Sequence, residues 1–170
     1  MCIRDSIYKN ERAGITISKF DFKKQDDAKT IDFGSKNIYK FWDISGSSEN
    51  LSYMVNGALE LVMRVKNLSN DDIELITQCQ KNENQIKASG SAECYRSFDL
   101  SEALTSKPVG KWIKIIMPLA CLDNNDFEIS AITSKAKLAT VGDWMVDVHS
   151  IKYKNNQELT SCKLHLEEYE

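Results

Sequence analysis

The stretch Leu59-Glu60-Leu61-Val62-Met63-Arg64-Val65 has an apolar side chain at every odd-numbered position. A period of two is the pattern of a β-strand with one buried face. The segment Ile73-Glu74-Leu75-Ile76-Thr77-Gln78-Cys79 repeats this pattern after a polar break. The two segments predict strands that contribute alternate side chains to a common core.

The same alternation continues toward both ends of the chain. Breaks of Gly, Asn, Asp and Ser separate the alternating segments, and no long segment with a period of 3.6 competes with them. The spacing is typical of antiparallel sandwiches, so we predict an all-β fold, an antiparallel β-sandwich. The further strand segments are 15–20, 31–33, 38–42, 112–119, 135–140 and 144–148.

One short helix is expected at residues 99–104. Asp99 is a suitable N-cap, and Glu102 follows three residues later as the partner of a capping box. A proline and Gly110 come after this segment and would end the helix. Leu100 and Leu104 would then pack against one end of the sandwich.

The length and composition fit one domain with a hydrophobic core. The chain has 170 residues, of which 42% are hydrophobic and 28% charged. We assign residues 14–163 to a single sandwich domain. Residues 1–13 read as a leader or linker, since 1–6 have no apolar core segment of a signal peptide, and 164–170 read as a charged C-terminal tail.

The net charge and the length of the apolar runs argue against two kinds of interaction. The formal net charge is −3, which argues against a nucleic-acid partner. The longest apolar run, residues 115–122, is too short to span a membrane. We therefore expect neither nucleic acid nor a membrane span.

No catalytic, cofactor or metal motif is present in the sequence. It lacks a Gly-rich phosphate loop, a Gly-x-Ser-x-Gly elbow and a His-Glu-x-x-His segment, and its two histidines are isolated. The cluster at 123–126 is predicted to be a polar turn rather than a calcium loop. Glu60, Glu74 and Asp147 occupy polar positions of strands and are expected to face solvent. We therefore expect no catalytic residue, no cofactor and no metal.

Aromatic side chains are the candidates for carbohydrate binding. Trp42, followed by Asp43 and a Gly-Ser-Ser segment, is the first candidate for a ring that stacks on a sugar, and Tyr53 and Tyr95 come next. The alternative for Trp42 is core packing, the usual role of aromatic residues in a small sandwich. Trp112 and Trp144 begin alternating strands and are expected in the core.

The cysteines suggest disulfides. Without Cys2, which lies in the expected leader, four cysteines remain and can pair in three ways. We favour Cys79 with Cys94 and Cys121 with Cys162. The first bond would close a loop of about 15 residues and stabilise the fold by about 3 kcal/mol. The alternative is four reduced thiols buried as small apolar groups.

One ordered string resembles a known family. Asp-Leu-Ser occupies 99–101, Pro-x-Gly-x-Trp occupies 108–112, and Pro-Leu-x-Cys occupies 118–121. This string resembles the C-terminal domain of bacterial family 3 glycoside hydrolases, the exo-glucanase and β-glucosidase type. That domain is a galactose-binding-like β-sandwich of the jelly-roll kind, and the resemblance covers about residues 14–153. The chain departs from the family in the glycine-poor segment 80–93 and at 135–136.

The resemblance implies a non-catalytic accessory module. It would pack on the catalytic domains of a parent β-glucosidase or exo-β-glucanase, in the periplasm or outside the cell, and could bind β-glucan through Trp42 and Tyr53. The alternative is a structural or protein-interaction sandwich without affinity for sugar, and a stand-alone glycosidase is a third reading.

The residues of the resembling string would have scaffold roles. Asp99 would cap the helix and Gly110 would allow a tight reversal. Trp112 would fill the core, and Pro118 would end a strand.

Overall fold

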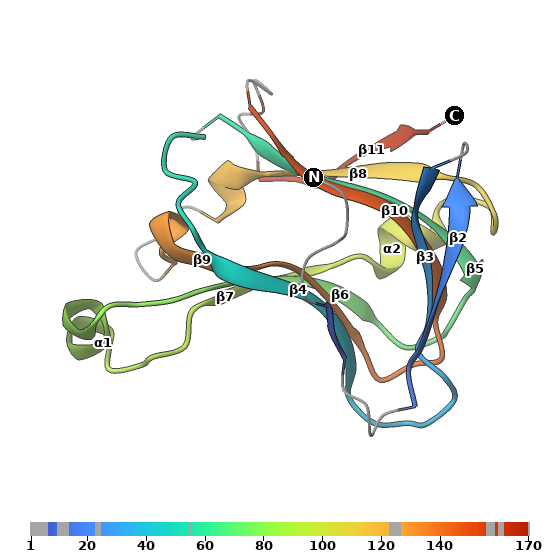
Figure 1. Ribbon diagram of the computed structural model, residues 1–170, viewed down its shortest axis with the longest axis horizontal. Coiled ribbons are helices and arrows are strands. Elements are labelled where there is room, and N and C mark those ends of the chain that lie inside the picture. Colours follow the sequence, from blue (N-terminus) through green and yellow to red (C-terminus); the bar gives the residue numbers. More distant parts are fainter. Residues whose placement is uncertain are drawn as a thin grey trace.

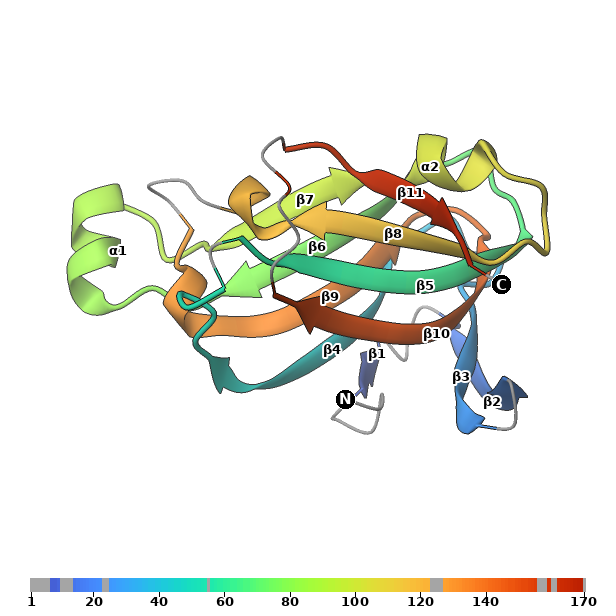
Figure 2. The same cartoon turned by 90° about the horizontal axis from the view of Figure 1, so that it is seen from above.

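The computed structural model describes residues 7–9, 14–22, 25–54, 56–122, 127–155, 159 and 162–169. Two antiparallel sheets pack face to face with short helices at the periphery, as Figures 1 and 2 show. The predicted all-β sandwich is confirmed. Cys2 and the predicted turn at 123–126 lie outside the described residues. No helix in the described part of the chain is long and apolar enough to cross a membrane.

In the described part of the chain, eleven strands form the two sheets, and each pair of neighbours is antiparallel. The five-stranded sheet has the order β1 (Ile7–Lys9), β4 (Lys40–Glu49), β9 (Ile132–Thr140), β6 (Ile73–Cys79) and β7 (Tyr95–Asp99). The six-stranded sheet has the order β11 (His165–Glu168), β8 (Ile113–Pro118), β5 (Ala58–Asn67), β10 (Met145–Lys154), β3 (Gln25–Asp32) and β2 (Thr16–Phe22).

The core lies between the sheets and follows the alternating pattern. Leu59, Leu61, Met63 and Val65 of β5 are all buried in it. Trp144, also fully buried, donates its indole N–H to the Asp71 carbonyl at 2.7 Å. The strands β5 and β6, although consecutive, lie in opposite sheets. Their inward faces therefore meet across the core instead of pairing edge to edge.

The described residues form two short α-helices, whereas the sequence predicts only one. The unpredicted helix, α1 (Glu83–Ser89), lies in the polar segment between β6 and β7. Asn82 and Gln85 form a capping box, and Gly90 ends the helix in the left-handed region with φ of 70°. This Asn-x-x-Gln…Gly pattern is the feature of the sequence that could have predicted the helix. The polar composition concealed it, because none of the helix residues is buried.

We expect Asn82→Ala to destabilise α1 by about 1 kcal/mol, because the amide N–H of Gln85 loses its acceptor. Amide hydrogen exchange at Ile86 and Gly90 should become about fivefold faster. Asn82→Asp retains the acceptor and should exchange like the wild type. Unchanged exchange in Asn82→Ala would show that the box does not hold the helix.

The predicted helix, α2 (Ser101–Thr105), begins later than expected. Asp99 is the last residue of β7, and its carboxylate accepts from the amide of Ser101 at 2.8 Å. The assigned N-cap is Leu100, without a side-chain cap bond, so the predicted capping box with Glu102 is wrong. Because Asp99 still pairs with Glu74 in the sheet, the helix begins one residue later than the sequence predicts. Leu100 and Leu104 are buried, as predicted.

Of the remaining residues of the resembling string, Gly110 and Pro118 have the predicted roles and Trp112 does not. Gly110 has φ of 87°, in the region that favours glycine, and Pro118 is the last residue of β8. Trp112, however, does not fill the core. It precedes β8 and lies half-buried on the outer side of the six-stranded sheet, where the Arg64 guanidinium is 4.8 Å from its ring centroid.

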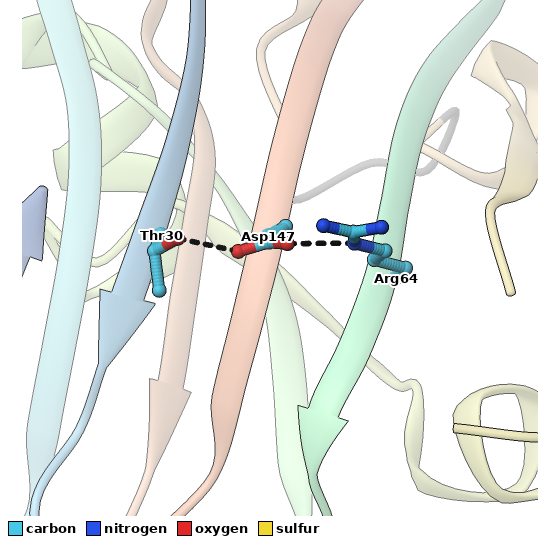
Figure 3. A network of polar contacts seen from close by, with 3 residues as sticks. All are labelled: Thr30, Arg64 and Asp147. Carbon is cyan, nitrogen blue, oxygen red and sulfur yellow. Dashed lines mark hydrogen bonds and ion pairs between the residues drawn. The ribbon is translucent and has the colours of Figure 1, made fainter. Parts of the chain in front are cut away.

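Asp147 corrects a second expectation on this outer side. It occupies a polar position of β10, but it is completely buried rather than facing solvent. Figure 3 shows its carboxylate between two neighbouring strands, accepting from the Thr30 hydroxyl on β3 at 2.5 Å and from Arg64 Nε on β5 at 2.6 Å. The side chains of Arg64 and its aromatic neighbours cover a position that alternation alone assigns to solvent.

The sandwich extends beyond the expected domain limits at both ends. Ile7–Lys9, which we placed in a leader, forms β1 and pairs with β4. His165–Glu168, which we placed in a charged tail, forms β11 and pairs with β8. Both are short edge strands, so their alternation is too brief to recognise. Ion pairs of Glu167 with Lys114 and of Glu168 with Lys107 explain why an edge strand carries these charges.

The four cysteines pair in the way that the sequence favours. Cys79 is bonded to Cys94, with a Cα–Cα distance of 5.1 Å, and joins the end of β6 to the segment before β7. Cys121 is bonded to Cys162 at 4.8 Å, and this bond joins the segment after β8 to the segment before β11. Two disulfides indicate an oxidising, extracytoplasmic compartment.

Candidate functional site

The outward side of the five-stranded sheet carries a cluster of aromatic and charged side chains. Inward positions such as Trp42, Leu75 and Leu138 fill the core, so the positions between them point outward. We call this cluster the sheet face. Its residues are Tyr39 just before β4, Phe41 and Asp43 on β4, Glu74 and Ile76 on β6, Tyr95 on β7, and Lys137 and Ala139 on β9.

Two tyrosine rings are available to a ligand on the sheet face. Tyr39 is 52% exposed and Tyr95 is 55% exposed. The Tyr39 ring lies beside Phe41, with 6.2 Å between centroids, and Lys137 Nζ is 4.8 Å from the centroid of the Phe41 ring. The ammonium group thus contacts Phe41, whereas the more exposed tyrosines offer open ring surface.

Carboxylates accompany these rings. Asp43 is mostly buried, accepts a hydrogen bond from the Ser134 hydroxyl, and lies 3.7 Å from Lys137 Nζ. Burial raises the pKa of Tyr39, and the negative charges of Glu74 and Asp43 and the neighbouring Tyr95 raise it further. The tyrosine is therefore a neutral phenol near pH 7, close enough to both carboxylates to be affected by them.

A polar hollow adjoins Tyr39 at one end of the sheet face. Its volume is about 320 Å³, and it is lined by Tyr39, Asn70, Asp71, Asp72, Glu74, Ala139, Thr140 and Val141. Carboxylate and amide oxygens accept hydrogen bonds from hydroxyl groups. Despite these acidic residues, the described part of the chain contains no group of three metal-ligating side chains suited to an ion.

A second hollow, which we call the end groove, has a volume of about 430 Å³. It is lined by the mostly buried residues Met54, Leu59, Ile151 and Tyr153, by the more exposed Glu49, Tyr53, Lys135, Lys152 and Lys154, and by Asn155. These residues come from the ends of β4 and β10, from the start of β5, from β9, which holds Lys135, from the segment between β4 and β5, which holds Tyr53 and Met54, and from the position just after β10. None of the sheet-face residues lines the end groove.

The three aromatic residues that the sequence suggests for sugar binding lie in three different places in the structure. Trp42 has no exposed surface and belongs to the core, so its role as a stacking platform is wrong. It pairs with Leu138 in the inward phase of β4, and no ligand can reach its ring there. Tyr95 lies on the sheet face. Tyr53, 70% exposed, lies at the end groove instead.

Several sheet-face residues were missed from the sequence. Phe41 and Asp43 flank Trp42, so the burial of Trp42 is itself the signal that its neighbours point outward. Tyr39 lies two residues before Phe41 and therefore points to the same side of the sheet. Glu74 and Lys137 come from strands that are distant in the sequence. Only the order β4-β9-β6 brings them to the same face.

The sequence also matches a known domain family. The profile of Exop_C, described as galactose-binding domain-like, matches residues 3–153. The chain belongs to the Exop_C family. The match begins before residue 14, in agreement with the place of β1 in the sheet. No curated protein sequence matches this Exop_C domain.

Solved structures share the fold at low sequence identity. The extra C-terminal domain X of the exo-1,3/1,4-β-glucanase ExoP from a Pseudoalteromonas species is 15% identical, with a TM-score of 0.59 over 85% of this chain and 72% of that one. The whole ExoP enzyme aligns at 16% identity with a TM-score of 0.59, over 86% of this chain, which spans only 16% of the enzyme.

A carbohydrate-binding module is similar as well. The family 30 module of the cellulosomal cellulase Cel9D-Cel44B from Clostridium thermocellum is 15% identical, with a TM-score of 0.65 over 84% of this chain and 83% of the module. The Exop_C domain therefore has the fold of a glucanase accessory domain and of a carbohydrate-binding module. At these identities the likeness concerns the fold alone.

Proposed function

We propose that this Exop_C domain is a non-catalytic accessory module of a glycoside hydrolase acting on β-glucosides and that its sheet face binds β-glucan. The observation that carries the proposal is the combination of exposed Tyr39 and Tyr95 with the carboxylates of Asp43 and Glu74 on one side of a sheet. The family and the likeness to a glucanase domain and to a family 30 module support it.

The chemistry of the sheet face suits a sugar chain. The C–H face of a pyranose ring is apolar and packs on an aromatic ring, and its hydroxyls need hydrogen-bond partners at the ring edge. Strands in a sheet lie about 4.8 Å apart, so β4 and β7 are separated by about 14 Å. An extended oligosaccharide could therefore contact Tyr39 at one side of the face and Tyr95 toward the other.

The proposed partners are β-glucan oligosaccharides and the catalytic domains of a parent glycosidase. The ExoP comparison supports the second, because the matching part of that protein is a small share of a larger glucanase. The disulfides support a periplasmic or extracellular location. In this arrangement the module would hold glucan near an active site on another domain.

Isothermal titration with cello- and laminari-oligosaccharides tests the glucan site. We expect Tyr95→Ala and Tyr39→Ala each to weaken binding about three- to tenfold, because each loses a stacking contact of about 0.5–1.5 kcal/mol. Tyr95→Phe keeps the ring and should bind nearly as well as the wild type. Tyr53→Ala is the matched control, since this exposed tyrosine lies outside the sheet face.

Two results would contradict the proposal of a glucan site, and a third would contradict the non-catalytic role. Absence of binding heat at millimolar oligosaccharide would leave only the alternative, a structural or protein-interaction role without sugar affinity. Equal losses in Tyr95→Ala and Tyr53→Ala would place the glucan elsewhere than on the sheet face. Turnover of an aryl glucoside by the chain alone would show that the module is itself catalytic.

A further inference from the structure

The end groove differs from the sheet face in charge. Among the described residues, three lysines and one glutamate line it, which gives these lining residues a net formal charge of +2 within a chain whose net charge is −3. Lys135 is paired with Glu49 at 2.8 Å. Lys152 and Lys154 form no ion pair with any described residue. Lys152 lies opposite Glu60 of β5 in the sheet register but is not ion-paired with it, and Lys154 lies opposite Ala58. Both of these groove lysines therefore keep an ammonium group without an ion-pair partner among the described residues.

The end groove also has the components of a sugar site. The Tyr53 ring is 70% exposed at its edge, and the buried side chains of Met54, Leu59 and Ile151 form an apolar lining. Glu49 is half-buried and offers carboxylate oxygens to hydroxyl groups. A ligand with one apolar ring face and several hydroxyls fits this lining better than a simple ion does.

The lining contains further unsatisfied polar groups. The hydroxyl of Tyr153 is buried without a hydrogen-bond partner among the described residues, and burial, followed by the charge of Glu49, raises its pKa. It therefore stays a neutral donor. In addition, β10 pairs with β3 only between Met145 and Val148, so its backbone at 150–154 has no paired strand on that side in the described part of the chain.

We propose that the end groove binds a saccharide unit that carries an acidic group, a carboxylate or a sulfate ester. Tyr53 stacks on the ring, Lys152 and Lys154 attract the acidic group, and Glu49 accepts hydrogen bonds from hydroxyls. This site is separate from the glucan site on the sheet face and does not depend on it. A neutral glucan cannot use the two lysines as counter-ions, so the groove should favour the acidic saccharide.

Nuclear magnetic resonance titration of the whole chain tests the inference. The probes are trigalacturonate, a sulfated galacto-oligosaccharide of similar length and neutral cellotetraose. We expect the acidic probes to shift the amide signals of Tyr53, Lys135 and Tyr153, and added salt to weaken this binding. The two acidic probes distinguish a carboxylate from a sulfate as the preferred group. Cellotetraose should shift sheet-face signals instead.

Charge reversal supplies the decisive comparison. The double variant Lys152→Glu/Lys154→Glu should bind the preferred acidic probe at least tenfold more weakly, and Tyr53→Ala several-fold more weakly. Lys66→Glu/Lys111→Glu is the matched control, because it changes the net charge equally at two exposed lysines outside the groove. Tyr95→Ala should leave acidic-probe binding unchanged, which separates this site from the glucan site.

Three outcomes would overturn the inference. The first is that neither acidic probe shifts the groove signals at millimolar concentration. The second is that cellotetraose shifts them as strongly as the acidic probes do. The third is that both charge-reversal variants weaken binding equally, which would show that overall charge and not the groove attracts the probe. A shared thermal transition temperature with the wild type would show that the variants are folded.

Discussion

Replacement of Arg64 by leucine should lower the free energy of unfolding by about 3 kcal/mol. The physical reason is Asp147, which has no exposed surface and, among the described residues, would keep only the Thr30 hydroxyl as a side-chain partner. Removing one member of a buried ion pair costs about 3–5 kcal/mol, because the other charge remains buried without compensation. We expect the lower end of this range, since the Arg64 side chain is 29% exposed.

Urea denaturation followed by circular dichroism measures this effect, and two further variants isolate its cause. Arg64→Lys keeps the charge but loses the planar group that lies over Trp112 and Phe20, so it should lose less stability. The double variant Arg64→Leu/Asp147→Leu removes both charges and should recover much of the loss. Ordinary surface substitutions change the free energy of unfolding by about 0.5 kcal/mol or less. If the free energy of unfolding of Arg64→Leu differs from that of the wild type by no more than this, Asp147 is not an uncompensated charge in the variant.

Replacement of Trp42 by alanine should destabilise the domain by about 3–5 kcal/mol, the usual cost of deleting a buried tryptophan side chain. Trp42 is completely buried between the sheets among apolar residues. Its indole N–H has no hydrogen-bond partner in the described part of the chain. Trp42→Phe should therefore lose only packing volume and should be less destabilising than alanine.

Thermal unfolding together with sugar titration checks this prediction. A loss of this size lowers the midpoint by roughly 10 °C in a domain of this length. Tyr95→Ala should show the reverse behaviour, with nearly unchanged stability and weaker glucan binding. If Trp42→Ala kept its stability and specifically lost affinity for sugar, the ring would have to be a ligand platform, which its burial contradicts.

The contrast between Trp42 and Phe41 explains how far the site was predictable. Alternation shows that neighbours in a strand face opposite sides, but an aromatic residue such as Trp42 is compatible with either side. Trp42 faces the core because Leu138 and other core residues pack against it, and these residues come from strands that are far away in the sequence. Asp147 illustrates the same point for charge, because its burial depends on Arg64 from a neighbouring strand.

The sequence by itself determined the class of the fold and the phase of its central strands. The period of two in 59–65 and 73–79 reflects a local backbone geometry, in which each residue points opposite to the one before, and the structure confirms the inward residues that it predicts. The turn glycine at 110 and the strand end at Pro118 are likewise local properties.

Only the tertiary structure decided which strands share a sheet and which outward residues share a face. The alternating segments 59–65 and 73–79 are adjacent in the sequence but lie in opposite sheets, and β9 lies between β4 and β6. Such an order depends on the packing of the whole core, since pairing energies between strands are similar locally. The gathering of Tyr39, Glu74 and Tyr95 on one face, and of Tyr53 with three lysines at another place, follows from that order.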